Sequence, residues 1–266
     1  MKRLEPLDGE CQVLDTCETA ESVSPALLDA VEALSGAKNI VVLTGAGISV
    51  ESGVPDFRSV GGIWETFDPF EFATREAFFR RPERCWDLFD ELALVLDKAK
   101  PNPAHVALSE WEQHLESMTI VTQNIDGLHQ AAGSGKVMEF HGGIGGFRCV
   151  WCLERYDGPP IEGQWPPPCL CGRLLKPDLV LFGDAIPDGL WERSVSAIGQ
   201  CDGVLVVGTS AQVAPFSELP GIAVRFGIPL VEVNLIPTSL SQPPSILVQG
   251  SAGRVVPNLV ERLVAR

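Results

Sequence analysis

The chain has 266 residues, of which 45% are hydrophobic and 21% charged. This balance is typical of a folded globular protein with one large domain, or a large domain carrying a smaller one. The formal net charge of −15 argues against nonspecific nucleic-acid binding, which needs a basic surface. An acidic surface either attracts basic, lysine-rich protein segments or only keeps the chain in solution. Apolar runs such as 204–207 are far too short to span a bilayer, so we expect no membrane association.

The N-terminal residues 1–23 are polar and acidic without a clear period, which predicts a loosely ordered tail. The opening MKRLEPLDGECQVLD has no apolar stretch behind its basic residues, so it is not a secretory signal. We therefore expect an intracellular, cytoplasmic protein. In such a chain the clustered members of the eight cysteines more often bind metal than form disulfides.

Short apolar strands and helical patterns alternate from residue 24 onward. Ser24-Pro25 is a helix start with a polar cap before the proline, and Gly36 ends that helix. Strands are predicted at 39–44, 119–122, 178–182, 203–207, 230–233 and 246–248. Further helices are predicted at 104–116, 190–198, 216–226 and 255–264. This alternation indicates an α/β fold with a Rossmann-like parallel sheet and helices on both faces.

Two stretches interrupt the alternation. Residues 60–100 carry an aromatic-rich helical pattern without a good strand, and residues 144–176 are rich in Gly, Pro and Cys. We interpret both as insertions that form a small lobe, a helical insertion (60–100) and a metal-binding module (144–176). The Rossmann-like core then comprises 24–59, 101–143 and 177–266, within a single catalytic domain of 24–266.

Four cysteines have the spacing of a metal site. Cys149-x2-Cys152 is followed by Cys169-x-Cys171, so two tight turns can each supply two thiolates to a tetrahedral ion. Iron–sulfur ligation and unligated buried thiols are the chemical alternatives. No spare ligand is evident, which indicates a structural metal.

A glycine turn, Gly45-Ala46-Gly47, follows the first predicted strand, where a dinucleotide site would lie. Glycines there would let backbone amides approach a pyrophosphate. A Gly-x-Gly alone is weak evidence, because a tight strand-to-helix turn has the same pattern. The third glycine of the dehydrogenase fingerprint is missing, since Val50 stands in its place.

Several ordered motifs nevertheless resemble one family. The run 45–59, GAGISVESGVPDFRS, resembles the sirtuin signature, and TQNIDGLH at 122–129 and EFHG at 139–142 match two further sirtuin motifs. The segments 208–210 with 213–215, and 233–235, match others in the right order. The resemblance covers about residues 24–264. It implies an NAD-dependent protein-lysine deacylase with one structural zinc on Cys149, Cys152, Cys169 and Cys171.

The resemblance also implies the site residues. His141 would be the general base that activates a ribose hydroxyl, because the unperturbed pKa of histidine lies near neutrality. Asn124 and Asp126 would assist it, and Phe57 would shield the reactive sugar carbon. The implied cofactor-binding residues are Gly45, Ala46, Gly47, Ser49, Asp56, Phe57, Arg58, Gln123, Asn124, Asp126, Gly208, Thr209, Ser210, Asn234, Leu235 and Ala252. Ser210 and Asn234 could instead be helix caps.

The acyl-lysine peptide is expected to bind as an added strand between segments 180–184 and 212–215. Its implied contacts are Val180, Phe182, Gly183 and Val213. Sirtuins that remove succinyl or malonyl groups carry Tyr-x-x-Arg on the helix after the aromatic loop. Phe89 and Leu92 stand at the matching positions here, which predicts a preference for acetyl or apolar acyl groups.

Three other functions compete. An ADP-ribosyltransferase or an NAD hydrolase would share the cofactor site and differ in the acceptor. A noncatalytic NAD-sensing module would lack the base, whereas His141 is present. An ordinary dehydrogenase is disfavoured by the incomplete fingerprint. We expect a monomer that binds an acyl-lysine protein or peptide.

Overall fold

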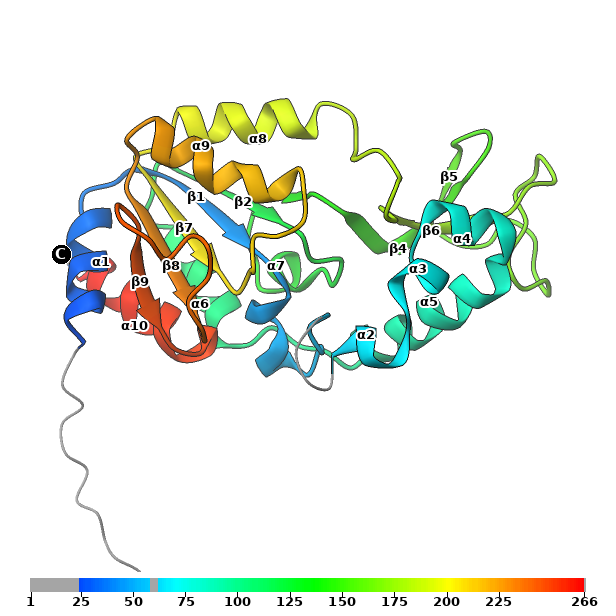
Figure 1. Cartoon of the computed structure of the whole chain (residues 1–266), viewed down its shortest axis with the longest axis horizontal. Coiled ribbons are helices and arrows are strands. Elements are labelled where there is room, and N and C mark those ends of the chain that lie inside the picture. The colour runs from blue at the N-terminus through cyan, green and yellow to red at the C-terminus, as the bar shows by residue number, and fades with distance from the viewer. Residues whose placement is uncertain (1–23, 58–61, 266) are drawn as a thin grey trace, which may run out of the picture.

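The structure is a computed structural model that describes residues 24–57 and 62–265. Its main sheet has six parallel strands in the order β3-β2-β1-β7-β8-β9 (Figure 1). The strands are β1 (Asn39–Thr44), β2 (Ser117–Thr122), β3 (Val137–Glu139), β7 (Gly203–Val207), β8 (Leu230–Asn234) and β9 (Ile246–Gln249). The predicted parallel α/β sheet is therefore confirmed.

Helices cover both faces of this sheet. One face packs against α1 (Pro25–Leu34), α6 (Pro103–Glu112) and α10 (Ala252–Val264), and the other against α8 (Leu190–Gly199) and α9 (Leu219–Arg225) (Figure 1). In β1, Ile40 and Val42 belong to the first core and Val41 and Leu43 to the second. Successive side chains of a strand point to opposite faces, so a strand covered on both sides reads as one continuous apolar run.

Helix ends follow the capping chemistry. The Ser24 hydroxyl accepts from the Leu27 amide at 3.2 Å and starts α1, as predicted. The Asn102 side chain caps α6, which ends at Glu112, before the predicted end at residue 116. Helix α10 begins at Ala252, earlier than the predicted residue 255.

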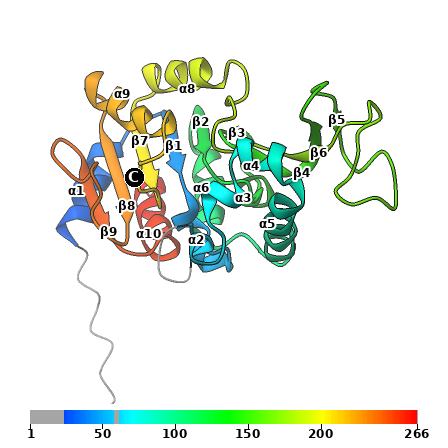
Figure 2. The same ribbon diagram turned by 45° about the vertical axis from the view of Figure 1, so that its right-hand side comes forward.

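A small lobe extends from one end of the sheet (Figures 1 and 2). Its helices are α2 (Ile63–Thr66), α3 (Pro69–Phe72), α4 (Arg75–Arg80) and α5 (Pro82–Leu96). They pack near a three-stranded antiparallel sheet of order β5-β4-β6, formed by β5 (Arg155–Tyr156), β4 (Gly142–Cys149) and β6 (Leu175–Leu179). An aromatic cluster that includes Phe78, Trp86 and Phe89 joins the helices to Leu179 and Leu181.

One predicted strand was assigned to the wrong sheet. The apolar run 178–182 was expected in the parallel sheet, but β6 ends at Leu179 and pairs antiparallel with β4 in the small lobe. An apolar run shows that a strand is buried and not which sheet buries it. The division of the chain into a core, a helical insertion and a metal-binding module stays a prediction.

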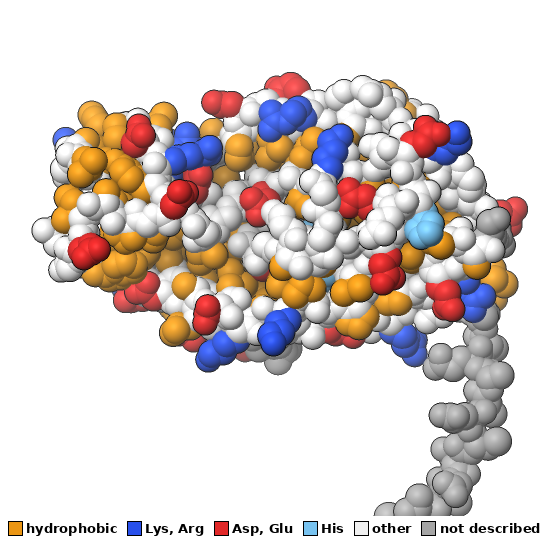
Figure 3. All heavy atoms as spheres, turned by 180° about the vertical axis from the view of Figure 1, so that it is seen from behind, with side chains coloured by type: hydrophobic (Ala, Val, Ile, Leu, Met, Phe, Trp, Pro, Cys, Tyr) orange, Lys and Arg blue, Asp and Glu red, His pale blue; other side chains and the backbone are white. Residues whose placement is uncertain are grey.

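The far end of the small lobe exposes apolar side chains. Seen from behind, hydrophobic atoms gather there (Figure 3). The exposed large residues of the module are Trp151, Leu153, Trp165 and Leu170. The fully buried core of the module comprises only Cys149, Cys169 and Leu175, which is too small to hold its loops by apolar burial alone. Among the described helices, none is long and apolar enough to cross a membrane.

Candidate active site and metal centre

The candidate site lies at the carboxyl edge of the parallel sheet. Strands β1, β2, β7 and β8 end at Thr44, Thr122, Val207 and Asn234. The implied cofactor residues follow directly after these ends, and parallel strands bring their carboxyl ends to a common edge. Segments far apart in the sequence therefore meet here, at the place where open α/β sheets bind ligands.

The glycine turn packs tightly against the loop after β7. The Gly45 amide donates to the Val207 carbonyl at 3.1 Å, and the Gly47 amide donates to the Gly208 carbonyl at 2.8 Å. A Cβ atom on Gly47 would lie 2.7 Å from the Gly208 Cα. The glycines are thus required by the close approach of two turns, and their own amides are bonded within the protein. The approach of backbone amides to a pyrophosphate stays a prediction, and the partner that the structure shows for these glycines is the Gly208 backbone.

One amide of this turn stays available. The Ile48 and Ser49 amides donate to the Gly45 and Ala46 carbonyls. Of the amides from Gly45 to Ser49, all within the described structure, only that of Ala46 has no recorded backbone acceptor. The Ala46 amide is therefore free to donate to an added group at this turn.

A buried serine joins the two polar residues that follow β2. The Ser49 hydroxyl donates to Asp126 Oδ2 at 2.7 Å and accepts from Asn124 Nδ2 at 3.1 Å. Asn124 also donates to the Gly45 carbonyl at 3.2 Å, and Asp126 Oδ1 accepts from the Leu128 amide at 3.0 Å. The structure thus brings Ser49, Asn124 and Asp126 together, and each is held in place on more than one side.

Two further contacts tie the strand ends together. Gln123 Nε2 donates to Thr209 Oγ1 at 2.7 Å, and Asn234 Nδ2 donates to the Thr209 carbonyl at 2.9 Å. Thr209 is buried between them, whereas Leu235 is 59% exposed at the surface. Ala252 lies at the first position of α10, where it is buried. Thr209, in the loop after β7, therefore fixes the positions of the side-chain amides of Gln123 and Asn234.

His141 follows β3 and faces the Gln123 backbone. Its Nδ1 atom lies 3.2 Å from the Gln123 carbonyl oxygen. A carbonyl only accepts, so we assign the ring proton to Nδ1, which leaves the lone pair on Nε2. Burial lowers the pKa of His141, and the backbone hydrogen bond opposes that shift only in part. The side chain is a neutral imidazole at physiological pH with a basic Nε2 atom.

A second histidine, His129, is linked to Asn124 through hydrogen bonds of two threonines. This role was not predicted from the sequence. His129 Nε2 lies 2.9 Å from Thr44 Oγ1, which donates to Thr122 Oγ1 at 2.8 Å. Thr122 Oγ1 in turn accepts from the Asn124 amide at 3.0 Å. Burial lowers the pKa of His129 to about 3, so this ring stays neutral. The signal in the sequence was that His129 is the last residue of the TQNIDGLH motif at 122–129.

The predicted substrate segment lies beside His141. The Val180 amide donates to the His141 carbonyl at 2.8 Å, and Phe182 and Gly183 are exposed. Val213 is half-buried after the β7 loop. A groove of about 1540 Å³ is lined by Asp126 and Val180 among other residues, whereas His141 and Val213 do not line it.

Aromatic rings connect the predicted cofactor loop to that segment. The rings of Phe57 and Trp64 lie 5.1 Å apart, and those of Trp64 and Phe182 lie 6.4 Å apart. The Asp56 carbonyl accepts from the Ile63 amide at 2.9 Å. Arg58, the remaining implied residue of this loop, lies outside the described residues.

Phe89 and Leu92 lie in the aromatic cluster of the small lobe. They are 2% and 7% exposed, and Leu181 of the substrate segment belongs to the same cluster. Asp90, on the same helix, accepts from Trp165 Nε1 at 3.0 Å. The surroundings of Phe89 and Leu92 are apolar.

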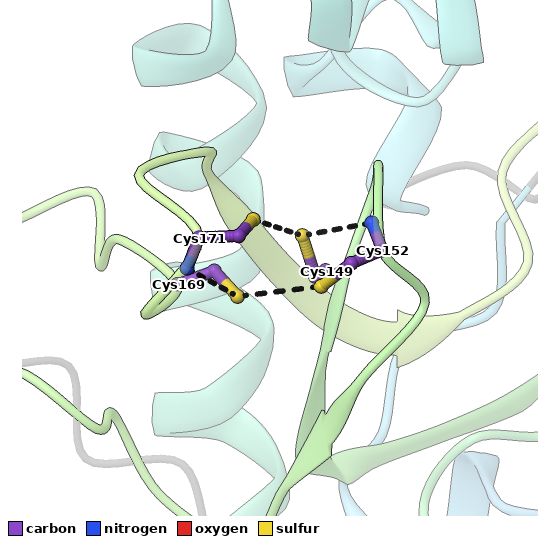
Figure 4. Close-up of side chains that lie close together, drawn as sticks. All are labelled: Cys149, Cys152, Cys169 and Cys171. Carbon is purple, nitrogen blue, oxygen red and sulfur yellow. Dashed lines mark hydrogen bonds between the residues drawn. The ribbon is translucent and has the colours of Figure 1, made fainter.

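The four predicted cysteines form one compact metal centre (Figure 4). Their sulfur atoms all lie within 4.8 Å of one another. The Cys149–Cys171 and Cys152–Cys169 sulfur distances are both 3.6 Å. Four thiolates at zinc–sulfur distances of about 2.3 Å in a tetrahedron lie about 3.8 Å apart. The donor set fits one zinc ion and fills its coordination sphere, which makes the centre structural.

Two neighbours support this centre. Gly172 has a φ of +80° after the second cysteine pair, a conformation that favours glycine. Tyr156 Oη lies 3.2 Å from Cys169 Sγ, and its hydroxyl would donate to the thiolate. Hydrogen bonds of this kind orient the ligands of a metal. Tyr156, the only tyrosine of the chain, was not among the residues expected from the sequence.

The fold and the site together define the class of this protein. A parallel α/β sheet gathers a neutral imidazole with amide and hydroxyl groups at its carboxyl edge, beside a tetrathiolate module. The Sir2 family model matches residues 45–215. The chain belongs to the Sir2, or sirtuin, family.

Similar proteins cover most of the chain. The NAD-dependent protein deacylase 2 of Pyrobaculum aerophilum is 43% identical over 241 residues, which are 90% of this chain and 96% of that protein. The NAD-dependent protein deacylase of Mycobacterium tuberculosis is 42% identical over 234 residues, 85% of this chain and 98% of the relative. A solved Sir2 structure with a deacetylated p53 peptide and 3'-O-acetyl ADP ribose has a TM-score of 0.79 and 33% identity, and covers 90% of this chain and 97% of that one.

Proposed function

We propose that this protein removes acetyl or other apolar acyl groups from protein lysines with NAD as co-substrate, giving nicotinamide, O-acyl-ADP-ribose and free lysine. The observation that carries the proposal is the position of His141. Its ring bonds the Gln123 carbonyl on the cofactor side, and its own carbonyl bonds Val180 on the substrate side. The relatives named NAD-dependent protein deacylase, from a bacterium and an archaeon, support it.

The chain's own residues divide the chemical work. NAD supplies an electrophilic sugar carbon when nicotinamide leaves. His141 accepts a proton at Nε2, because Nδ1 is engaged with the Gln123 carbonyl. The Ser49-linked pair of Asn124 and Asp126 presents an amide and a carboxylate in a fixed arrangement, which favours orientation of the cofactor's ribose and carboxamide.

Exclusion of water falls to the aromatic residues. Water would otherwise attack the electrophilic sugar carbon and consume NAD without deacylation. Phe57 and Trp64 form a ring pair that continues to Phe182 of the substrate segment. We propose that this pair covers the reacting centre while the peptide lies along the same segment.

The substrate peptide is proposed to add as a strand. Within the described residues, the Val180 carbonyl and the Gly183 amide have no recorded backbone partner, and Phe182 and Gly183 are exposed. Main-chain pairing of an added strand gives affinity with little sequence preference. Val213 would contact the peptide from the opposite side. The acyl group then points toward the apolar cluster around Phe89 and Leu92.

We also propose a monomer in the cytoplasm. Cysteines that lie this close together are kept reduced in the cytosol, whereas oxidising compartments favour disulfides. Light scattering of the purified protein tests the oligomeric state, and fractionation of the source cells tests the compartment.

The test is an assay of nicotinamide and O-acetyl-ADP-ribose release from an acetyl-lysine peptide, with and without NAD. Wild type should release both products only with NAD. His141→Ala should lose about 10²–10⁴-fold in deacetylation, the usual contribution of a general base. His114→Ala, at an exposed position, is the matched control. Nicotinamide release that does not depend on the acyl-peptide would instead identify an NAD hydrolase or an ADP-ribosyltransferase.

A further inference from the structure

The substrate segment ends in a tight turn with a glycine at the position that requires a positive φ. The Asp184 amide donates to the Leu181 carbonyl at 2.9 Å, which closes a four-residue turn. Gly183, the third residue, has a φ of +88°, as a type II turn requires at that position. The Asp184 carboxylate also accepts from the Leu181 amide at 3.2 Å. The turn is thus closed by both the backbone and the side chain of Asp184.

A buried lysine holds this turn from inside the lobe. Lys176, on β6, is 8% exposed. Its ammonium group lies 3.3 Å from Asp184 Oδ2 and 3.5 Å from the Pro177 carbonyl, and it donates to the Leu179 carbonyl. An ammonium group has three protons, and three acceptors surround it here. Lys176 therefore connects the strand that leads into the substrate segment with the turn that ends it.

The other charged side chains near this pair either have partners of their own or are exposed to solvent. Asp178, the carboxylate on β6, pairs with Arg155 at 2.8 Å and with Arg148 at 3.8 Å. Arg75 lies 4.0 Å from Asp184 but its side chain is 57% exposed, so it contributes little. Burial lowers the pKa of Lys176, and the Asp184 carboxylate opposes this shift. The ammonium group and the carboxylate thus depend on each other in a buried place.

The rest of the segment is bonded to two other parts of the protein. The Phe182 amide donates to the Ala73 carbonyl at 3.0 Å, and the Phe182 carbonyl accepts from Arg75 at 2.9 Å. The Val180 amide bonds the His141 carbonyl. These bonds hold the middle and the start of the segment, and the Lys176–Asp184 pair connects its end to β6.

We propose that Lys176 and Asp184 are positioning residues for the substrate: their buried ion pair sets the edge of the Val180–Gly183 segment on which the acyl-lysine peptide is paired. This inference rests on the proposed function. The pair acts on the peptide and not on NAD, because its contacts reach the substrate segment and none reaches the glycine turn or the β7 loop. Loss of the pair leaves the peptide to order the turn when it binds, which weakens binding.

The test compares the KM for the acyl-lysine peptide with the KM for NAD. Lys176→Met should raise the KM for an acetyl-lysine peptide about tenfold, or about 1.4 kcal/mol of binding, and leave the KM for NAD within about twofold. Lys176→Arg, which keeps the charge, should recover much of the loss. Lys38→Met is the matched control, because Lys38 pairs with Glu116 at 2.7 Å on the surface, with side chains 67% and 62% exposed. It should change neither KM.

A second variant covers the case in which Lys176→Met does not fold. The double variant Lys176→Met/Asp184→Leu leaves no unpaired buried charge, so it should fold and still show the raised peptide KM. An unchanged peptide KM in a folded variant overturns the inference, and so does an equal rise in both KM values. If wild type shows no deacylation, the proposed function has failed. In that case, fluorescence anisotropy measures the affinity of a labelled acetyl-lysine peptide. The positioning role requires that the variant binds this peptide more weakly than wild type does.

Discussion

The backbone carbonyl of His141 lies 2.8 Å from the backbone nitrogen of Val180. The residue whose ring is the proposed base is therefore hydrogen-bonded through its main chain to the first residue of the substrate segment. Its ring meanwhile bonds the Gln123 carbonyl at 3.2 Å. One residue thus joins the two halves of the site, and a shift of the substrate segment would move the base as well.

The first prediction concerns the pH dependence of catalysis. The base must be neutral to accept a proton, so kcat/KM falls as the pH drops through the pKa of His141. Burial lowers this pKa below the ordinary value of 6.5. The acid limb of a pH–rate profile with an acetyl-lysine peptide should therefore lie below pH 6.5. A limb centred above that value would contradict the assignment of His141 as the buried base.

The second prediction tests the packing of the two glycine turns. Gly47→Ala places a Cβ 2.7 Å from the Gly208 Cα, so it should cost about 1–3 kcal/mol of stability and weaken NAD binding. Thermal melts with and without NAD measure both effects. Gly145→Ala is the control, because nothing lies within 4 Å of its Cβ position. Equal effects of the two substitutions would show that the close approach at Gly47 does not matter.

The third prediction concerns the pH dependence of stability. Burial holds the pKa of His129 at about 3, below the ordinary value of 6.5, so folding favours the neutral ring. This stability is fully present above pH 6.5 and is lost as the pH falls toward the folded pKa. One such group contributes up to about 1.4 kcal/mol per pH unit.

Urea unfolding between about pH 7 and pH 5 measures this loss, in a range where most carboxyl groups stay ionised. His129→Gln should show a flatter dependence than wild type. His114→Gln, at an exposed position, should match wild type. If the three curves run parallel, His129 is not the buried neutral group that the structure describes.

The fourth prediction concerns the metal. The purified protein should hold one zinc per chain, and removal by a chelator should lower the melting temperature, because the buried core of the module is small. Tyr156→Phe removes the hydroxyl next to Cys169 Sγ and should weaken zinc binding about 10–100-fold in a chelator competition. Cys201→Ser, outside the quartet, should keep full zinc content. Unchanged affinity in Tyr156→Phe would show that the hydroxyl does not support the thiolate.

The fifth prediction concerns the acyl group. Phe89 and Leu92 lie in an apolar cluster, so burial of a succinyl carboxylate there would be unfavourable. Wild type should therefore act faster on acetyl-lysine than on succinyl-lysine peptides. The double variant Phe89→Tyr/Leu92→Arg should lower the ratio of kcat/KM for the acetyl-lysine peptide to kcat/KM for the succinyl-lysine peptide. Leu94→Arg, 60% exposed on the same helix, should leave the ratio unchanged. Faster desuccinylation by wild type would overturn the prediction.

Local patterns were sufficient for much of the fold. Period, capping residues and glycine positions predicted five strands of the parallel sheet and the start of α1 at Ser24. Helix ends were less well predicted, as at Glu112, because they depend on packing as well as on local residues. The short strand β3 (Val137–Glu139) had not been given bounds, since three half-buried residues carry little periodic signal.

The sequence by itself determined the alternating order of strands and helices, the cysteine spacing and the ordered motifs of the family, because these depend on residues close together in the chain. Tertiary structure alone decided which turn packs on Gly47, which sheet contains β6, and which carboxylate pairs with Lys176. Such contacts join residues that no local pattern relates. They form when the lobe and the sheet bury their apolar faces, and that packing brings the buried polar groups to their partners.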